Sequence, residues 1–283
     1  MLRLLSIEFH KLKHNGASRI LSLIYFGLLT CIALIAAIKF DIGFIQLHFA
    51  DQGIFNFPYI WHFNTYVASI FKFFLLVVIV SMMANEYSYK TLKQNLIDGL
   101  SKKEFILSKF YTVVAFAGIS TTFVFFISLV LGLIYSDYNE LNIIFSDLQY
   151  LFGFFLKLIS FFSFGLFMGI LVKRSAFAIG GIVVWYLIEK ICWLIALFSY
   201  RHLLGQDSIS KANEAISFLP LESMSNLIKE PGTRLNAVKT LANAIEQQIV
   251  KNYDVEILDI LIVSTWTFIF IYASYRLLKK RDL

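Results

Sequence analysis

The sequence predicts an all-α integral membrane protein with six transmembrane helices. Of its 283 residues, 58% are hydrophobic and only 16% are charged, and the mean hydropathy is +0.72. A soluble domain of this length carries about a quarter charged residues. The hydrophobic residues also gather in continuous stretches of about 20 residues, the length that crosses a bilayer as a helix. They lack the alternating segments of about ten residues that are typical of a transmembrane β-barrel.

Each of the six stretches predicts one span, and we treat residues 1–283 as a single transmembrane domain. The predicted spans are Arg19–Ile38, Tyr66–Ala84, Phe110–Tyr135, Tyr150–Val172, Ala176–Ser199 and Glu256–Tyr275. No span carries a nucleophile with a base, or a set of metal ligands, so we expect no catalytic residue and no metal site.

Residues 1–17, ahead of the first span, predict an amphipathic helix that lies in the plane of the membrane interface. Its apolar residues recur at heptad spacing, at Leu2, Leu5, Phe9 and Leu12. Its basic residues Arg3, Lys11 and Lys13 are then available to lipid phosphates.

Basic residues in the loops predict the orientation of the chain. They gather at the N-terminus, between the second and third spans, at Lys173-Arg174 and in the tail after the last span. Because lysine and arginine are enriched in cytoplasmic loops, we expect both termini in the cytoplasm. We attribute the net charge of +6 to this bias and expect no nucleic acid as a partner.

Residues 85–104, between the second and third spans, predict a short amphipathic helix on the cytoplasmic side. Tyr89, Leu92 and Leu96 form one apolar stripe. Such a helix can receive a push from a cytoplasmic partner and pass it to the next span. The alternative is a solvated loop whose charges only set the topology.

The end of this segment predicts a turn and a new helix. Asp98-Gly99 is a turn signal. Ser101 followed by Glu104 is a capping box, so we expect the third membrane helix to begin at about this point.

Four charged residues interrupt the spans away from their ends: Lys72, Lys157, Glu189 and Lys190. In the predicted topology all four lie in the outer half of the bundle. Either the lysines extend to the external headgroups, or the four residues line an outward cavity for an anionic group of a transported molecule. We favour the first explanation, because a lysine stem reaches about 6 Å and the expected depth is about 10 Å. We further expect Glu189 to pair with Lys157 or Lys72, since Lys190 points about 100° away on its helix.

Two further features concern packing and the outer face. Gly165 and Gly169 predict a close helix contact, either within the chain or between two copies of it. Residues 200–255 predict an external helical connection between the fifth and sixth spans, made of three short helices of which the last follows Thr233.

The cytoplasmic segment resembles that of the permease subunits of type-2 ABC exporters. In that family a Glu at the end of the second span is followed by Gly-Thr-Leu, a Leu-rich turn, Ser-Arg and a Lys that opens the third span. The corresponding residues here are Glu86, Thr91, Leu92, Leu96, Ser101, Lys102 and Lys109. Lys90 stands where Gly is usual, and Leu100 stands where Pro is common.

The resemblance implies a coupling helix that docks on a separate ABC ATPase subunit. The residues that would make this contact or shape it are Glu86, Tyr89, Thr91, Leu92, Lys93, Leu96, Gly99, Ser101 and Lys102. The chain has no G-x-x-x-x-G-K-[ST] motif, so we expect it to be no enzyme, with ATP and Mg bound by the partner. The resemblance also implies a second copy or a related permease as partner, contact with membrane lipids, and a place in the bacterial cytoplasmic membrane.

Two other functions remain open at this point. A membrane scaffold or assembly subunit would bind a partner without transport. An ion-coupled secondary transporter is disfavoured, because the spans contain no cluster of acids and no evident inverted repeat with broken helices.

Overall fold

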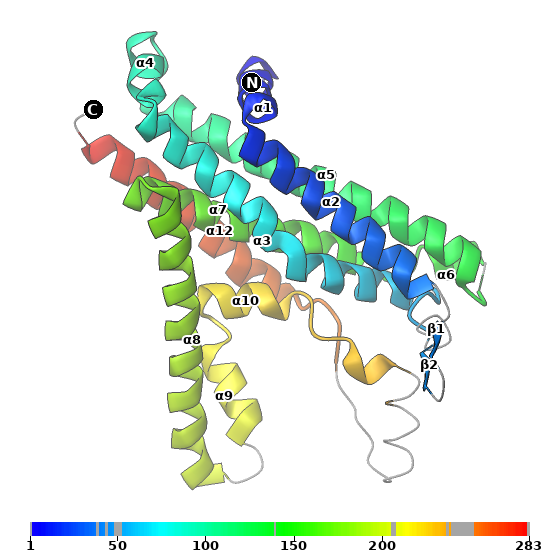
Figure 1. Ribbon diagram of the computed structural model, residues 1–283. Helices are drawn as coiled ribbons and strands as arrows, with labels where there is room; N and C mark the ends of the chain where they lie inside the picture. Colours follow the sequence, from blue (N-terminus) through cyan, green and yellow to red (C-terminus); the bar gives the residue numbers. More distant parts are fainter. Residues whose placement is uncertain are drawn as a thin grey trace.

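A computed structural model of the chain shows a bundle of long helices (Figure 1). It describes residues 2–37, 40–42, 45–47, 53–138, 140–204, 208–235, 238 and 252–281. The elements are α1 (Leu2–His14), α2 (Gly16–Ala37), β1 (Phe40–Ile42), β2 (Ile45–Leu47), α3 (Tyr59–Ser88), α4 (Thr91–Ile97), α5 (Lys102–Tyr135), α6 (Leu141–Ile144), α7 (Gln149–Val172), α8 (Ser175–Leu204), α9 (Ser208–Ile216), α10 (Pro220–Asn226), η3 (Gly232–Arg234) and α12 (Ile257–Lys280).

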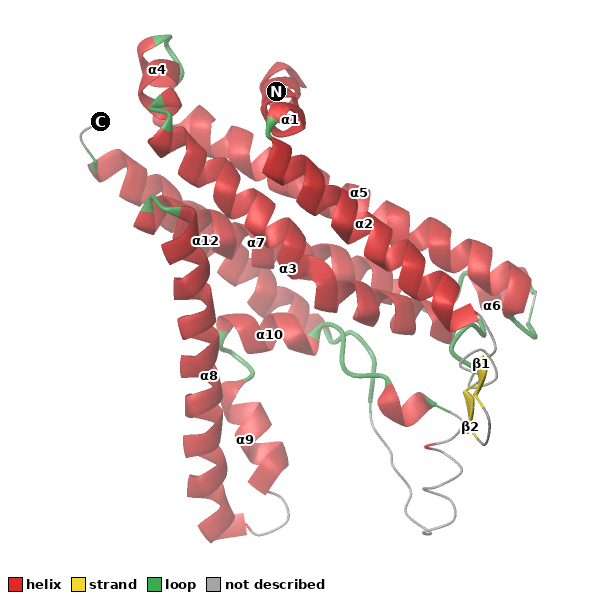
Figure 2. Ribbon diagram, in the orientation of Figure 1, coloured by secondary structure: helices red, strands yellow, loops and turns green. Residues whose placement is uncertain are grey.

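Six segments of the described chain are long and apolar enough to cross a membrane. They are α2, α3, α5, the continuous segment of α6 and α7, α8, and α12. The predicted all-α membrane fold with six spans is therefore confirmed. The sequence analysis does not foresee the short antiparallel pair of β1 and β2, which joins Phe40 to Leu47 and Ile42 to Ile45 (Figure 2).

The core of the bundle is built around α7, which packs against α3, α5, α8 and α12. Two glycines let α7 approach α3 closely. A Cβ atom at Gly165 would collide with the Leu76 side chain, and one at Gly169 would lie 3.1 Å from Met83 Cβ. Of the two interpretations of this glycine pair, close packing within the chain is the one observed.

The fifth span, α8, leaves the bundle at a steep angle (Figure 1). Of its residues 175–201, only Ala178, Ile182 and Glu189 are buried. The external connection packs on this side: α9 contacts α8, and α10 contacts α8, α7 and α12. The helical prediction for this connection holds for α9 and α10, whereas most of the third predicted helix falls outside the described residues.

One end of the bundle carries α1, α4 and the C-terminal end of α12 (Figure 1). The predicted amphipathic helix at residues 1–17 and the predicted helix between the second and third spans are both present, as α1 and α4. The opposite end carries α6 and the strand pair (Figure 2).

Candidate functional site

The short helix α4 is held by defined turns at both of its ends. At its C-terminal end Gly99 has a φ of 96°, a left-handed conformation that favours glycine. The Leu100 N–H donates to the Asn95 carbonyl at 3.0 Å, and the Gly99 N–H donates to the Leu96 carbonyl at 3.2 Å. This pair of hydrogen bonds is a Schellman ending. The turn predicted at Gly99 is therefore confirmed.

The capping box at the start of α5 is also confirmed. Ser101 Oγ accepts from the Glu104 N–H at 3.2 Å, and Glu104 Oε2 accepts from the Ser101 N–H at 2.9 Å. The two reciprocal bonds satisfy backbone donors at the helix start and fix the direction in which α5 leaves the turn.

Lys90 adopts a left-handed conformation at the start of α4, with a φ of 57°. A side chain is disfavoured in this region, whereas glycine is not. Lys90 stands at the position where the permeases that this segment resembles usually have glycine. Its left-handed backbone gives a physical reason for a glycine at this position.

The predicted single apolar stripe of Tyr89, Leu92 and Leu96 is wrong. Leu92 is only 2% exposed, and Leu96 packs against the core beside it. Tyr89 is 74% exposed and faces away. Tyr89 belongs to the end of α3, and the left-handed Lys90 interrupts the helical spacing between it and Leu92. The exposed residues of this segment instead include Tyr89, Lys93 and Ile97, of which Ile97 is 69% exposed.

Behind α4 lies a buried charge cluster, formed by Glu8, Lys11, Glu86 and Lys109. Glu86 Oε1 lies 2.6 Å from Lys109 Nζ and 2.8 Å from Lys11 Nζ. Glu8 Oε2 lies 2.5 Å from the same Lys109 nitrogen. Lys109, Glu8 and Glu86 are 0%, 4% and 3% exposed. Two carboxylates face two ammonium groups, so the cluster can be buried without a net charge.

The buried charge cluster also holds α4. Glu86 Oε2 accepts hydrogen bonds from Thr91 Oγ1 at 2.5 Å and from Asn95 Nδ2 at 3.4 Å. Both donors lie on α4, whereas the cluster itself draws on α1, α3 and α5. One carboxylate therefore connects the short helix to three longer ones.

The sequence analysis expects Lys11 to be available to lipid phosphates. In the structure Lys11 is part of this cluster and is not free for them. Burial lowers the pKa of Lys11, but the hydrogen bond to Glu86 and the negative charges of Glu8 and Glu86 more than offset it. The pKa of Lys11 therefore lies above its ordinary value. The lysine stays charged throughout the neutral range and keeps the cluster balanced.

The start of α5 and the end of α3 also contact the last residues of the described chain. Lys102 Nζ donates to the Arg281 carbonyl at 2.9 Å. The Arg281 guanidinium donates to Tyr87 Oη at 3.2 Å and to the Leu171 carbonyl at 2.9 Å. The ends of α7 and α12 are thereby attached to the helices that flank α4.

The four charged residues inside the spans form a second region, and the predicted pairing of Glu189 with Lys157 or Lys72 is wrong. Glu189 accepts from the Trp185 indole N–H at 2.7 Å and from the backbone N–H groups of Leu221 and Glu222 at 3.1 and 2.9 Å. Its partners are the first turn of α10 and a tryptophan one turn earlier on α8.

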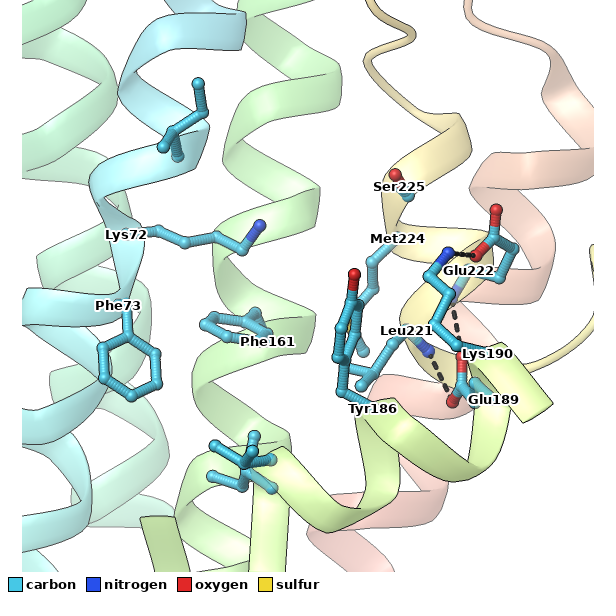
Figure 3. Close-up of a pocket in the computed structure, with 13 residues that line it drawn as sticks. Lys72, Phe73, Phe161, Tyr186, Glu189, Lys190, Leu221, Glu222, Met224 and Ser225 are labelled. Atoms are coloured by element: carbon cyan, nitrogen blue, oxygen red, sulfur yellow. Dashed lines mark hydrogen bonds and ion pairs between the residues drawn. The ribbon is translucent and has the colours of Figure 1, made fainter. Parts of the chain in front are cut away.

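Lys190 pairs with an acid that the sequence analysis does not single out. Lys190 Nζ lies 3.0 Å from Glu222 Oε2 (Figure 3). Lys72 and Lys190 line one cavity of about 390 Å³, together with Glu189 and Glu222. The cavity lies between α3, α7, α8 and α10 (Figure 3).

Three residues of these sites escape the sequence reasoning: Glu8, Glu222 and Arg281. Glu8 leaves a signal, because it is an acid on the apolar face of a basic amphipathic helix, three residues after Leu5 and four before Leu12. Glu222 and Arg281 leave none, since their partners are distant in the sequence.

A comparison with protein families finds one match across most of the chain. Residues 4–190 match a family model described as ABC-2 family transporter protein. The matched region includes most of α1, α4, all four members of the buried charge cluster, and Lys72, Lys157, Glu189 and Lys190. No curated protein matches the sequence.

Proposed function

Because this chain belongs to the ABC-2 transporter family and is an ABC transporter permease, we propose that it couples ATP hydrolysis by a separate ATPase subunit to the export of a substrate. The observation that carries the proposal is the construction of α4. Its exposed side presents Lys93 and Ile97, Tyr89 is exposed just before it, and its inner face is fixed to the bundle.

The contacts of α4 support a role in transmitting force. The helix is short, so it cannot bend much between its two fixed turns. Its bonds to Glu86 connect it to the charges of Lys109 on α5 and Lys11 on α1. A displacement of α4 by a docked protein would therefore act on three other helices together.

The energy source in this proposal is the partner. The sequence carries no G-x-x-x-x-G-K-[ST] motif. ATP and Mg would be bound by the ATPase subunit, and this chain would hold no cofactor and catalyse no reaction.

The remaining partners and the location belong to the same proposal. A second copy of this chain, or a related permease, would complete the pathway, and most of α8 is exposed or half-buried in the described part of the chain. The protein would lie in the bacterial cytoplasmic membrane, with both termini and α4 in the cytoplasm and lipid around the spans.

Co-purification with the ABC ATPase subunit tests the docking face. We expect Tyr89→Asp and Ile97→Asp to weaken binding at least about tenfold, because each places a charge in the centre of the contact. The bundle should remain folded, since both side chains are exposed. Tyr138→Asp is the matched control: it changes a tyrosine that is 50% exposed near the opposite end of α5.

Leu92→Asp separates docking from folding. Leu92 is buried, so this variant should lose folded protein rather than ATPase binding alone. Full ATPase binding by Tyr89→Asp and Ile97→Asp would contradict the proposed docking face. Binding without ATP-driven export would favour the scaffold function instead.

A further inference from the structure

Two lysines inside the bundle lack a compensating charge. Lys157 is 3% exposed on the central helix α7, and Lys72 is half-buried on α3. Neither forms a hydrogen bond or an ion pair with any residue that the structure describes. Lys157 lies one helical turn before Phe161 on α7. Lys72 Nζ instead lies over the Phe161 ring, 4.8 Å from its centre.

The acids that line the same cavity are already engaged. Glu189 accepts three N–H groups, and Glu222 is paired with Lys190. Figure 3 shows these carboxylates gathered at α8 and α10, while Lys72 reaches across from α3. Within the described part of the chain, therefore, no carboxylate is left for Lys72.

The Lys72 side chain does not reach the start of its own helix either. Lys72 lies about 20 Å along α3 from its first residue, Tyr59, at about 1.5 Å per residue. A lysine stem of about 6 Å covers only part of this distance. Because α3 begins seven residues before the predicted span, Lys72 lies farther from the end of its helix than the sequence analysis expects.

Apart from Tyr186 and Ser225, the rest of the cavity wall is apolar. Phe161 and Met224 line its interior, and its rim carries Ile70, Phe73 and Val183, which are 59%, 40% and 46% exposed. An exposed apolar rim on membrane-spanning helices faces lipid chains. The cavity thus combines a positive group inside with an apolar entrance from the side.

We propose that this cavity binds an anionic amphiphile, a molecule with an apolar chain and a phosphate or carboxylate group, and that Lys72 holds the anionic group. Lys157, one turn before Phe161 on α7, adds a second positive charge next to the site. The Lys190–Glu222 pair and Glu189 form the side of the site next to α10. That the bound amphiphile is the exported substrate rests on the proposed transport function; a resident anionic lipid is the other source of the same chemistry.

Binding to the full permease–ATPase complex in phosphatidylcholine nanodiscs tests the site. The probes are dodecyl phosphate, the neutral dodecanol and inorganic phosphate. We expect dodecyl phosphate to bind and Lys72→Gln to weaken it about tenfold, the usual scale for losing one charged hydrogen bond. Lys72→Arg should restore most of the affinity. Lys211→Gln is the control, because Lys211 lies on α9 outside the cavity and pairs with Glu214.

Three outcomes would overturn the inference. Equal affinity for dodecanol and dodecyl phosphate would show a purely apolar cavity. Equal affinity for inorganic phosphate would remove the need for an apolar chain. An unchanged affinity in Lys72→Gln would place the anion elsewhere, and the complex's gel-filtration profile verifies that the variant is folded.

ATPase activity then separates substrate from resident lipid. Stimulation of ATP hydrolysis by dodecyl phosphate, lost in Lys72→Gln, would support binding of an exported amphiphile. Binding without stimulation would overturn the assignment as substrate and leave a lipid site. If none of the probes binds while the ATPase still docks on α4, this inference is contradicted and the proposed function is not.

Discussion

Two deeply buried lysines of this protein, Lys109 and Lys157, lie in opposite surroundings. Lys109, near α4, has the carboxylates of Glu8 and Glu86 at 2.5 and 2.6 Å. Lys157, on the central helix, has no carboxylate partner among the described residues. A balanced cluster fixes helices to one another, whereas an unbalanced charge is costly unless something outside the chain compensates it. The comparison indicates that the helices are rigidly connected near α4, and that a ligand site lies deeper in the bundle, near Lys157.

The largest effect is expected from Lys109→Met, which removes one ammonium group from the buried charge cluster. Two buried carboxylates would then share Lys11 alone. We expect the free energy of unfolding to fall by about 3–5 kcal/mol, the usual cost of removing one partner of a buried ion pair. Denaturant titration in mixed micelles measures it, with the exposed Lys103→Met as control. A loss below about 1 kcal/mol would mean that the cluster contributes little.

The same substitution at Lys157 should have the opposite sign. Lys157→Met replaces an unpaired buried ammonium group by an apolar side chain of similar length. Without added ligand we expect the free energy of unfolding to rise by about 1–3 kcal/mol, because the cost of burying the charge disappears. The same titration compares it with Lys109→Met. Destabilisation of similar size in both variants would erase the contrast between the two lysines.

The smallest effect on stability is expected at Lys90, whose backbone lies next to the buried charge cluster. Lys90→Gly relieves a left-handed conformation and should raise the free energy of unfolding by about 0.5–1 kcal/mol. Lys90→Ala removes the same charge but keeps a Cβ atom, so it should give no such gain. If the two variants prove equally stable, the side chain and not the backbone determines the effect.

Local patterns in the sequence predict the fold and part of the site. Continuous apolar stretches identify all six spans, and the residues Gly99, Ser101 and Glu104 identify the turn and the start of α5. These features depend on residues that are close together in the sequence, so the sequence displays them directly. Helical spacing also shows that Leu92 and Leu96 share a face, but it does not say whether that face is buried or exposed.

The parts that sequence reasoning misses depend on distant or uncharged partners. The pair of Glu8 and Lys109 joins residues 101 positions apart. Glu189 finds its donors in backbone N–H groups of α10, and no charge pattern reveals those. The search for an opposite charge therefore led to Lys157 and Lys72, which the structure leaves unpaired among its described residues.

The glycines of α7 have a consequence for how the molecule can move. With Leu76 and Met83 of α3 seated over Gly165 and Gly169, neither helix can slide along its axis without a steric clash. These two helices must shift together, as one body. Among the described residues α8 is mostly exposed and packs chiefly on α9. Opening and closing of the cavity between α3 and α8 would therefore be a tilt of α8 and α9 relative to the rest of the bundle.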